Sequence, residues 1–454
     1  MLRPALGALL LTLAACTSGA ASGGSADSGT PGNIDQASLP RTPASTVPAS
    51  VLSSAVAANN AFAFDLYGRV RTSPDAGAGN LWTSPLSASL ALTMTYAGAQ
   101  GQTATQMATA LHLGSAPGSV FAGQNALLQA LASRTATALA SDTTTYSAAG
   151  LPAPSPSNYD LTVVNAVWGE QTYPWAQPFL DVLAQSYGTG VHLEDFEHQW
   201  APARLAINAW VSNETADKIS NLLPEGSLDD TTRMVLVNAI HLRMPWAYPF
   251  DVSATKPGTF TRGDGTTVTT SFMQSLQIMG FSYDDNVSTA WVPLSGGQLW
   301  VVIAVPQGDL ATYEAGLTPD KPGALAPPAN PMQVQLSLPK VTFASPSFSL
   351  AKELQAMGMV QPFDKRAADF KGLCASPPDG DNLYIADVLQ KATLAMQETG
   401  VEAAGATGSL VSGDLATPPW MVVDSPYLVA IVDGPTGAIL FLGHVQDPTD
   451  MGSP

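Results

Sequence analysis

Hydrophobic patterning along this chain places helices first and strands later. Residues 55–67 and 87–113 carry apolar side chains in arrangements that predict buried helices. Two largely apolar runs, residues 161–168 and 234–242, predict buried central strands, and strand-like segments dominate residues 260–305. Because we find no internal repeat, this order predicts one mixed α+β domain.

Local composition marks the connections between these segments. Residues 141–157 are rich in Ser, Thr and Pro and predict a loop, as do the Pro-rich residues 318–331. Residues 349–357 predict a short helix with Ser349 at the N-cap.

The charge balance excludes several classes of partner. Of 454 residues, 45% are hydrophobic and only 12% are charged, against about 25% charged in an average soluble domain. The 18 basic and 36 acidic side chains give a net charge of −18. Binding to a phosphate backbone or to an anionic membrane surface needs a basic face, so we expect neither partner. Two cysteines exclude a disulfide scaffold.

The first sixteen residues predict an export signal. Arg3 is followed by a short apolar run that ends in Leu13-Ala14-Ala15-Cys16, and the run is too short to span a bilayer. This ending resembles the cleavage box of bacterial lipoproteins, in which the cysteine is lipidated. The alternative is an ordinary signal peptide in which Cys16 is incidental. The first interpretation predicts an exported protein that is lipid-anchored to the cell envelope or surface and touches the membrane only through Cys16; otherwise it is extracellular.

Composition then divides the rest of the chain. Residues 17–50 are small and polar with few large apolar side chains, which predicts a flexible linker. We expect the folded domain to cover residues 51–449 and a short tail to follow at 450–454.

No catalytic site is visible. The G-x-S-x-G elbow of serine hydrolases is absent. Ser349-Leu-Ala-Lys352 matches the S-x-x-K of penicillin-recognising enzymes, but no K-T-G follows. The five histidines are scattered, and no pair has the spacing of metal ligands. We therefore expect no catalytic residue, no metal and no cofactor.

The segment 398–408 is unusual because it continues directly from the strand predicted at residues 389–397. It contains no proline and only small side chains after Glu402. Its alternation is compatible with an exposed loop or with an extra strand squeezed into a sheet; the alternative is a flexible Gly/Ala linker. One face of such a strand carries Val401, Ala403, Gly405 and Thr407, and the other carries Glu402, Ala404, Ala406 and Gly408.

At this segment the sequence resembles the serpin family, whose reactive-loop hinge has the pattern E-x-G-x-E-A-A-G-A-T found at residues 398–407. The resemblance extends over nearly all of residues 51–449. Further family motifs occur in order and at family spacing at residues 80–87, 98–103, 207–219, 237–250, 338–340, 357–359 and 441–448.

The resemblance implies a serpin fold with three β-sheets, about nine helices and an exposed reactive-centre loop. It implies a monomeric suicide inhibitor of serine proteases, not an enzyme, which forms a covalent acyl complex with its target when the cut loop inserts into the main sheet. With no basic patch in the sequence, we expect no heparin-type polyanion cofactor. A non-inhibitory serpin that serves as a binding or storage protein is the alternative.

The resemblance also assigns roles to residues. The hinge comprises Glu398, Gly400, Val401, Glu402, Ala403, Ala404, Gly405, Ala406 and Thr407. The shutter under the main sheet comprises Ser84, Ser87, Asn238 and Gln390, and the breach contains Trp246.

Two of the departures from the family pattern fall in the hinge and the shutter. Val401 replaces the usual Thr or Ser at the first inserting position, and Gln390 replaces the shutter histidine. We expect Val401 to permit insertion, because an apolar β-branched residue is buried readily in a strand. We expect Gln390 to bridge Asn238 and the region of Ser84 and Ser87.

The position of the scissile bond stays open between two neighbours. Counting forward from Glu398 places Asp414 before the cut and Leu415 after it, whereas counting back from Pro426 places Leu415 before the cut. Asp414 would select an Asp-specific protease with a basic pocket. Leu415 would select a chymotrypsin- or subtilisin-like protease with an apolar pocket.

Overall fold

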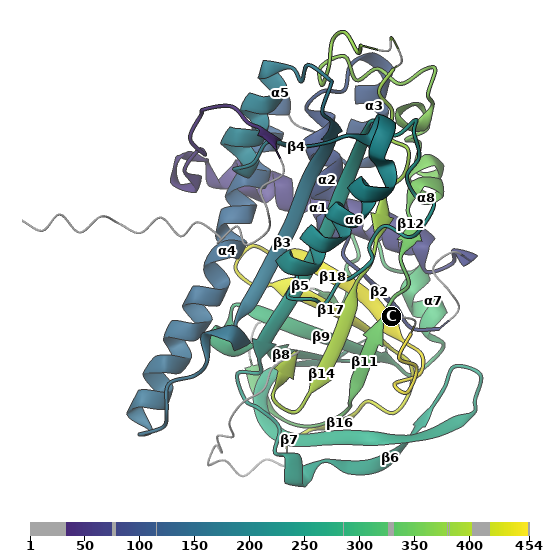
Figure 1. Ribbon diagram of the computed structural model, residues 1–454. Helices are drawn as coiled ribbons and strands as arrows, with labels where there is room; N and C mark the ends of the chain where they lie inside the picture. Colours follow the sequence, from purple (N-terminus) through teal and green to yellow (C-terminus); the bar gives the residue numbers. More distant parts are fainter. Residues whose placement is uncertain are drawn as a thin grey trace, which may run out of the picture. The chain divides into compact units, whose positions relative to one another are not determined.

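Figure 1 shows the chain as a computed structural model. The structure describes residues 33–74, 79–114, 116–284, 286–325, 331–378, 380, 382–401 and 418–452.

A seven-stranded sheet runs through the domain in the order β1-β4-β3-β5-β15-β14-β11. Its long central strands β3 (Asp160–Glu170) and β5 (Met234–Pro245) pair antiparallel, and both contain the apolar runs that predicted them. The other strands are β1 (Ile34–Asp35), β4 (Val191–Glu194), β11 (Val341–Ala344), β14 (Thr393–Gln397) and β15 (Gly400–Val401).

A nine-stranded sheet and a two-stranded pair account for the other strands of the described residues. The larger sheet has the order β16-β10-β7-β8-β9-β17-β18-β2, with β6 paired to β7. Its strands are β2 (Leu81–Thr83), β6 (Lys256–Thr261), β7 (Thr267–Asp284), β8 (Val287–Pro293), β9 (Leu299–Pro306), β10 (Pro331–Pro339), β16 (Trp420–Val422), β17 (Tyr427–Asp433) and β18 (Ala438–Val445). The short pair joins β12 (Phe348–Ser349) to β13 (Leu389–Gln390).

Eight α-helices accompany these sheets in the described residues, against about nine expected. They are α1 (Ala49–Val70), α2 (Pro85–Tyr96), α3 (Gly101–Ala110), α4 (Pro117–Ala148), α5 (Gln177–Val182), α6 (Phe196–Glu214), α7 (Leu310–Ala315) and α8 (Ala351–Ala356). The expected α+β class is confirmed. None of these helices combines the length and hydropathy that would be needed to cross a bilayer.

Both faces of the central strands β3 and β5 are covered, which explains why these strands are largely apolar. Helix α6 covers one face, where Ile207 and Val211 pack with Val235, Val237 and Ala239. Helix α2 contacts the other face of β3 and β5.

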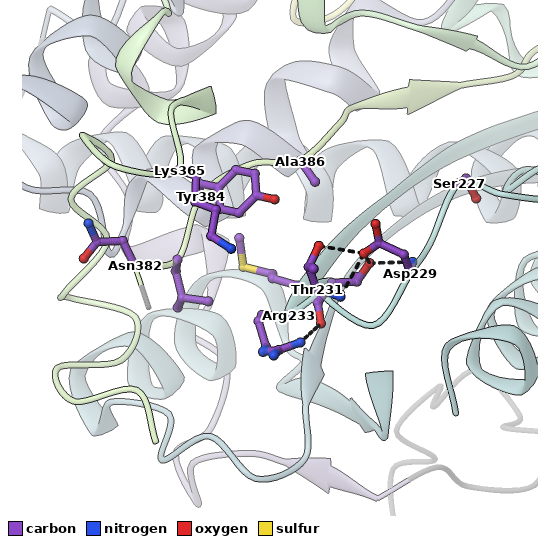
Figure 2. Close-up of a pocket in the computed structure, with 11 residues that line it drawn as sticks. Ser227, Asp229, Thr231, Arg233, Lys365, Asn382, Tyr384 and Ala386 are labelled. Carbon is purple, nitrogen blue, oxygen red and sulfur yellow. Dashed lines mark hydrogen bonds between the residues drawn. The ribbon is translucent and has the colours of Figure 1, made fainter. Parts of the chain in front are cut away.

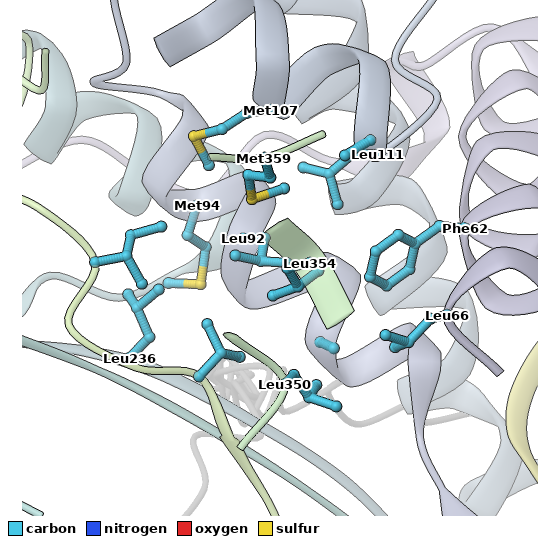
Figure 3. Close-up of a cluster of buried hydrophobic side chains, with 14 of the residues drawn as sticks. Phe62, Leu66, Leu92, Met94, Met107, Leu111, Leu236, Leu350, Leu354 and Met359 are labelled. Carbon is cyan, nitrogen blue, oxygen red and sulfur yellow. The ribbon is translucent and has the colours of Figure 1, made fainter. Parts of the chain in front are cut away.

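The main hydrophobic core joins this second face to the helices. Figure 3 shows side chains from α1, α2, α3 and α8 packed in one cluster that also includes Leu236 of β5. Phe62, Leu92, Met107 and Leu354 are each fully buried there. Complete burial of one such side chain is worth about 1.5–3 kcal/mol, so this cluster fixes the helices against the sheet.

Helix α4 continues to Ala148, well into the segment 141–157 that composition assigned to a loop. The hydroxyls of Thr143, Thr144 and Thr145 donate to the carbonyls four residues earlier, at Leu139, Ala140 and Ser141. These hydroxyls therefore form hydrogen bonds within the helix instead of favouring a non-helical backbone. The predicted loop begins only after the helix ends, where Gly150 adopts the left-handed conformation with a φ of 69°.

The folded unit begins before Val51, within the predicted linker. Residues 33–50 are described, and β1 pairs with β4. The side chains of Asn125 and Gln129 donate to the carbonyl of Thr42, and Arg41 donates to Asn125. Side-chain bonds to the linker backbone are invisible in composition, which is why this attachment was not predicted. Residues 17–32 lie outside the described part.

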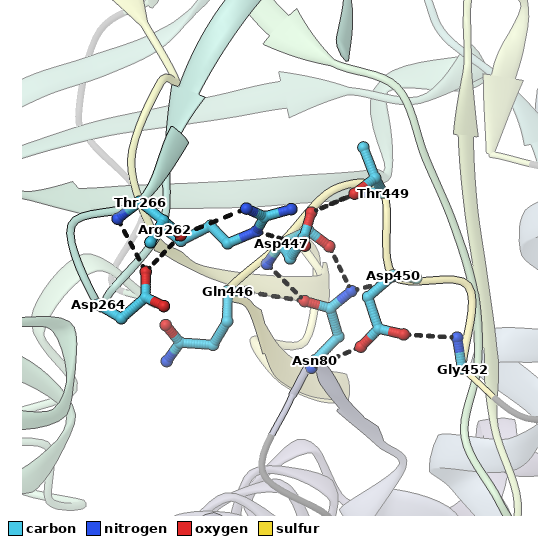
Figure 4. Close-up of polar contacts among 9 residues, drawn as sticks. All are labelled: Asn80, Arg262, Asp264, Thr266, Gln446, Asp447, Thr449, Asp450 and Gly452. Carbon is cyan, nitrogen blue, oxygen red and sulfur yellow. Dashed lines mark hydrogen bonds and ion pairs between the residues drawn. The ribbon is translucent and has the colours of Figure 1, made fainter. Parts of the chain in front are cut away.

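The C-terminal segment is fixed by Asn80, the first residue of the motif at 80–87. Its side-chain nitrogen donates to the carbonyls of Asp447 and Asp450, and its oxygen accepts from the amides of Gln446 and Asp447 (Figure 4). Arg262 adds an ion pair of 2.6 Å to Asp447. The first residues of the predicted tail are therefore attached to the domain.

A buried ion pair connects α4 to the turn after β17. Arg134 donates through Nε and a terminal nitrogen to both carboxylate oxygens of Asp433, at 2.6 and 3.0 Å. The Asp433 side chain is fully buried and also accepts from the amide and hydroxyl of Thr436.

We predict that Arg134→Met lowers the free energy of unfolding by about 3–5 kcal/mol, because it leaves a buried carboxylate without its cation. The double variant Arg134→Met/Asp433→Asn should lose less than Arg134→Met alone, since the amide oxygen still serves Thr436 without a charge. Urea titration of both variants measures this. Arg69→Met, at an exposed position of α1, is the control and should change little. Equal losses in the single and double variants would contradict the prediction.

Candidate functional site

The hinge begins as a tight hairpin between two strands of the seven-stranded sheet. Strand β14 ends at Gln397, the chain turns over Glu398 and Thr399, and β15 returns beside it. Val401 pairs with Met396 of β14 on one side and with Met244 of β5 on the other. Its side chain is only 3% exposed. The start of the hinge therefore already occupies a strand position between β5 and β14.

Trp246, the predicted breach residue, holds the turn of this hairpin. Its indole Nε1 donates to the carbonyl of Gln397 at 2.8 Å, and its backbone amide donates to the carbonyl of Thr399 at 3.1 Å. The amide of Phe250 donates to the carbonyl of Glu398 at 2.8 Å. The Trp246 and Phe250 rings meet edge to face, with centroids 5.9 Å apart. These three donors fix the backbone from which the loop departs.

The side chain of Glu398 adds an electrostatic anchor. Lys340, just after β10, forms an ion pair with it at 2.9 Å, and the Thr255 hydroxyl donates to its other oxygen at 2.9 Å. Burial raises the pKa of this carboxyl, but the hydrogen bonds from Lys340, from its own backbone amide and from Thr255 outweigh that effect and hold the pKa below its ordinary value. Glu398 is therefore anionic at neutral pH.

The edge of β5 that faces β14 is paired over a much shorter length than its other edge. Within the described residues, β5 forms a ladder on this edge only at Met244 and Pro245, opposite β15. Its other edge pairs with β3 over ten consecutive residues, from Met234 to Arg243. Strand β13 continues the line of β14 toward the start of β5 but pairs with β12. On this edge the rest of β5 therefore has no ladder partner in the described residues, although β13 lies close to it.

The shutter residues come together only in part. Gln390 donates to the carbonyl of Ser84 at 2.8 Å and accepts from the amide of Ser84 at 3.3 Å. The Ser84 hydroxyl caps α2 by accepting from the amide of Ser87, and it donates to Leu440. The expected bridge from Gln390 to Asn238 is absent, because both bonds of the Gln390 amide go to the Ser84 backbone.

Two shutter side chains remain unpaired in the described part of the chain. Asn238 is 1% exposed and Ser87 is fully buried, and neither side chain has a hydrogen-bond partner there. Asn165, which lies opposite Asn238 in the ladder, is in the same condition.

Several predicted site residues lie outside the described residues. These are the hinge residues Glu402, Ala403, Ala404, Gly405, Ala406 and Thr407, the bond between Asp414 and Leu415, and Cys16. Their roles remain predictions.

Three residues that anchor the hinge were not assigned a role from the sequence. Lys340 and Phe250 stood in family motifs, but the motifs give no partner for either side chain. Thr255 carried no signal, because it reaches Glu398 across 143 residues of sequence.

In the S-x-x-K motif, the hydroxyl of Ser349 forms hydrogen bonds within the fold. Ser349 lies in β12, one residue before the N-cap of α8 and not at it. Its hydroxyl accepts from the amide of Ala351 and donates to Asp387. In the described residues, no group of three His, Cys, Asp or Glu side chains is arranged to hold a metal ion.

Comparison with known proteins agrees with this geometry. The family model described as Serpin (serine protease inhibitor) matches residues 57–448. The leukocyte elastase inhibitor of Bos taurus is 32% identical over 404 residues, which cover 86% of this chain and 99% of that protein.

Two solved structures illustrate the likeness in fold. The thermophilic serpin Tengpin in its native state superposes with a TM-score of 0.74 at 22% identity, over 92% of this chain and all of that one. Thyroxine-binding globulin in complex with thyroxine has a TM-score of 0.70 at 27% identity, over 88% of this chain and 99% of that one.

The ordered motifs, the hinge hairpin between β5 and β14 and the match over residues 57–448 lead to one conclusion: this chain belongs to the serpin family of protease inhibitors.

Proposed function

We propose that this protein is a suicide inhibitor of serine proteases that traps its target by inserting the cut loop into the seven-stranded sheet. The observation that carries the proposal is the arrangement of the hinge. Strand β15 is already bonded between β5 and β14, and the edge of β5 below it has no ladder partner in the described residues.

The chemistry requires no catalytic group from this chain. The serine oxygen of the protease attacks the carbonyl carbon of the residue before the scissile bond, and its proton passes to the protease's base. The bond from that carbon to the next nitrogen breaks, and the new amine takes up the proton. The acyl ester that remains joins the protease to the new end of the loop. Insertion then carries the ester away from the loop's original position before water hydrolyses it.

The hinge sequence suits such an insertion. Residues 403–408 are all small or short, so they present little bulk to the faces covered by α2 and α6. Thirteen residues, 402–414, extend about 43 Å at roughly 3.3 Å per residue. This reach exceeds the length of β5, whose 12 residues span about 40 Å at the same rise.

The specificity of the inhibitor depends on the scissile bond. Asp414 before the cut would require a protease with a basic specificity pocket, and Leu415 would require an apolar one. The relatives include elastase inhibitors, but at about one-third identity their target is not carried over to this chain.

A non-inhibitory binding role is the second candidate, because thyroxine-binding globulin shares the fold. The small side chains of the hinge and its seat between two strands favour inhibition instead. Cleavage without a covalent complex would favour the binding role.

We also propose that the exported protein is held at the cell envelope through a lipid on Cys16. The support is the Leu-Ala-Ala-Cys sequence after a short apolar run. Metabolic labelling with a fatty-acid probe, compared between the full chain and Cys16→Ser, tests this.

The first test of inhibition uses residues 33–454 with chymotrypsin, subtilisin, elastase, trypsin and an Asp-specific protease. We expect an SDS-stable covalent complex with at least one of them. Mass spectrometry of the released C-terminal peptide locates the bond: a peptide beginning at Leu415 assigns the cut to Asp414, and one beginning at Ala416 assigns it to Leu415. Cleavage by every protease with no complex would refute the proposal.

A second prediction concerns Val401, which is buried between Met244 and Met396. Val401→Arg places a charge at that position, at a cost of several kcal/mol, and each increase of about 1.4 kcal/mol in the insertion barrier slows insertion tenfold. We expect the fraction trapped as covalent complex to fall at least about tenfold while loop cleavage continues. Val401→Thr, which restores the usual family residue, is the matched control and should keep the complex. Unchanged trapping by Val401→Arg would contradict the proposed insertion.

A third prediction concerns the anchor at Glu398. Because the pKa of this carboxyl is lowered on folding, its stabilising contribution is present above the unfolded value and is lost as the pH falls through the folded value. Glu398→Gln should therefore lower the melting temperature of the intact protein by a few degrees at pH 7. This difference should shrink below pH about 4.3, the ordinary value for Glu.

Melting curves of both proteins between neutral and acidic pH measure this effect. Glu225→Gln changes an exposed turn residue and serves as the control. A difference that stays constant over the whole pH range would show that Glu398 does not stabilise the hinge through its charge.

A further inference from the structure

Exposed apolar side chains gather on one face of the nine-stranded sheet, where it ends at β16. Trp420 of β16 is 68% exposed, and Val422, two residues later on the same face, is also exposed. Leu276 and Ile278 of β7 are exposed in the same way. Strand β10 lies between the two strands, and its ladders place Trp420, Gln335 and Leu276 in one row across the sheet. We refer to the four apolar residues as the β16–β7 face.

The β16–β7 face is apolar where a sheet of this kind is normally polar. The opposite face of these strands is buried in the core, where Met421 is 3% exposed and Leu336 is fully buried. An antiparallel sheet with one buried face usually turns polar side chains to solvent on the other. The ladder neighbours Gln274, Gln333 and Gln335 are polar but uncharged. An exposed apolar patch beside polar neighbours is typical of a protein contact surface.

A polar cavity beside the start of β5 offers no comparable surface (Figure 2). Asp229 accepts from the amide and hydroxyl of Thr231, at 2.9 and 2.7 Å. One guanidinium nitrogen of Arg233 donates to the carbonyls of Asp230 and Thr232, at 2.7 and 2.8 Å. These charged groups are therefore engaged within the chain.

Strand β10 connects the β16–β7 face to both ends of the reactive-centre loop. Lys340, directly after β10, pairs with Glu398 before the loop departs, at 2.9 Å. The amide of Gln335 donates at 2.9 Å to the carbonyl of Pro419, where the chain has returned to the sheet. The face therefore begins where the returning end of the loop joins β10.

The scissile bond is joined to this face by a short length of chain. Leu415 stands on one side of the cut in either assignment, and five residues of chain from there to Trp420 span at most about 18 Å. A compact protease of about 200 residues has a radius of gyration of about 16 Å, so its surface extends about 20 Å to each side of its cleft. A protease that holds the scissile bond therefore has surface within reach of the β16–β7 face.

We propose that the β16–β7 face is a docking surface for the target protease, which contacts it through a neutral apolar patch beside its substrate cleft. This inference rests on the proposed function, because the partner is the protease that attacks the loop. Trp420 is the most exposed of the four residues, and tryptophan is enriched among the residues that dominate protein interfaces. Since insertion carries the ester away from the loop's original position, the contact acts on the complex that precedes cleavage.

The test uses the protease that is trapped fastest among the five named above, with its catalytic serine replaced by alanine. This protease cannot cleave, so its Kd for the intact chain, measured by surface plasmon resonance, reports docking alone. We expect Trp420→Ala to raise the Kd at least about tenfold, as loss of a tryptophan at the centre of an interface does. Leu276→Gln, which lies on β7 and outside the loop, should raise it severalfold. Leu39→Gln changes a leucine of similar exposure, 40% against 42%, in the segment before α1 and should leave the Kd unchanged.

The active protease supplies a second measurement. Trp420→Ala should slow formation of the covalent complex in proportion to the change in Kd. The fraction of cleaved chain that is trapped should stay the same, because docking precedes insertion. Melting temperatures should also stay the same, because the altered side chains are exposed.

Equal Kd values for Leu276→Gln and the unaltered chain would overturn the docking surface, even if Trp420→Ala weakens binding, and would leave trapping and the proposed function standing. A concentration-dependent dimer of the unaltered chain that Leu276→Gln dissociates would assign the face to a second copy and overturn the proposal as well. Absence of a covalent complex with every protease would remove the proposed function and this inference together.

Discussion

The edge of β5 that faces β14 is the constraint on which the rest of this structure depends. An edge strand has main-chain N–H and C=O groups without hydrogen-bond partners in the sheet, and proteins normally cover or otherwise protect such edges. Here the edge lies inside the sheet, between β5 and β14, and only the two residues of β15 pair with it in the described part of the chain. The part of this edge that has no ladder partner is where the proposed function places the loop.

The elements around β5 leave this edge able to pair with another strand. Helices α6 and α2 cover the two faces of β5, so its side chains are buried whether or not its backbone is paired on both sides. Trp246, Lys340 and Thr255 fix the turn before β15, so an inserting strand would start from one defined register. A fixed start is consistent with a sheet that accepts another strand.

The sequence predicted the structure best where burial requires a regular pattern of apolar side chains. The runs at 161–168 and 234–242 predicted β3 and β5, because strands buried on both faces are largely apolar. The alternation around Val401 is compatible with a strand or a loop, and Val401 lies buried in β15. Contacts between distant polar side chains were not predictable in this way. Gln390 bonds to the Ser84 backbone and not to Asn238, and residues 33–50 attach through Asn125 and Gln129. Such hydrogen bonds depend on where the side chains lie in space, and they produce no regular pattern in the sequence.

The distribution of charge along the loop agrees with the proposed insertion. The chain has only 18 lysines and arginines in 454 residues and a net charge of −18, so the pairing of Lys340 with Glu398 before the loop departs is not an accident of a basic surface. Glu402 is the only charged residue of the segment 399–413. The segment thus carries small neutral side chains where burial in the sheet would penalise charge.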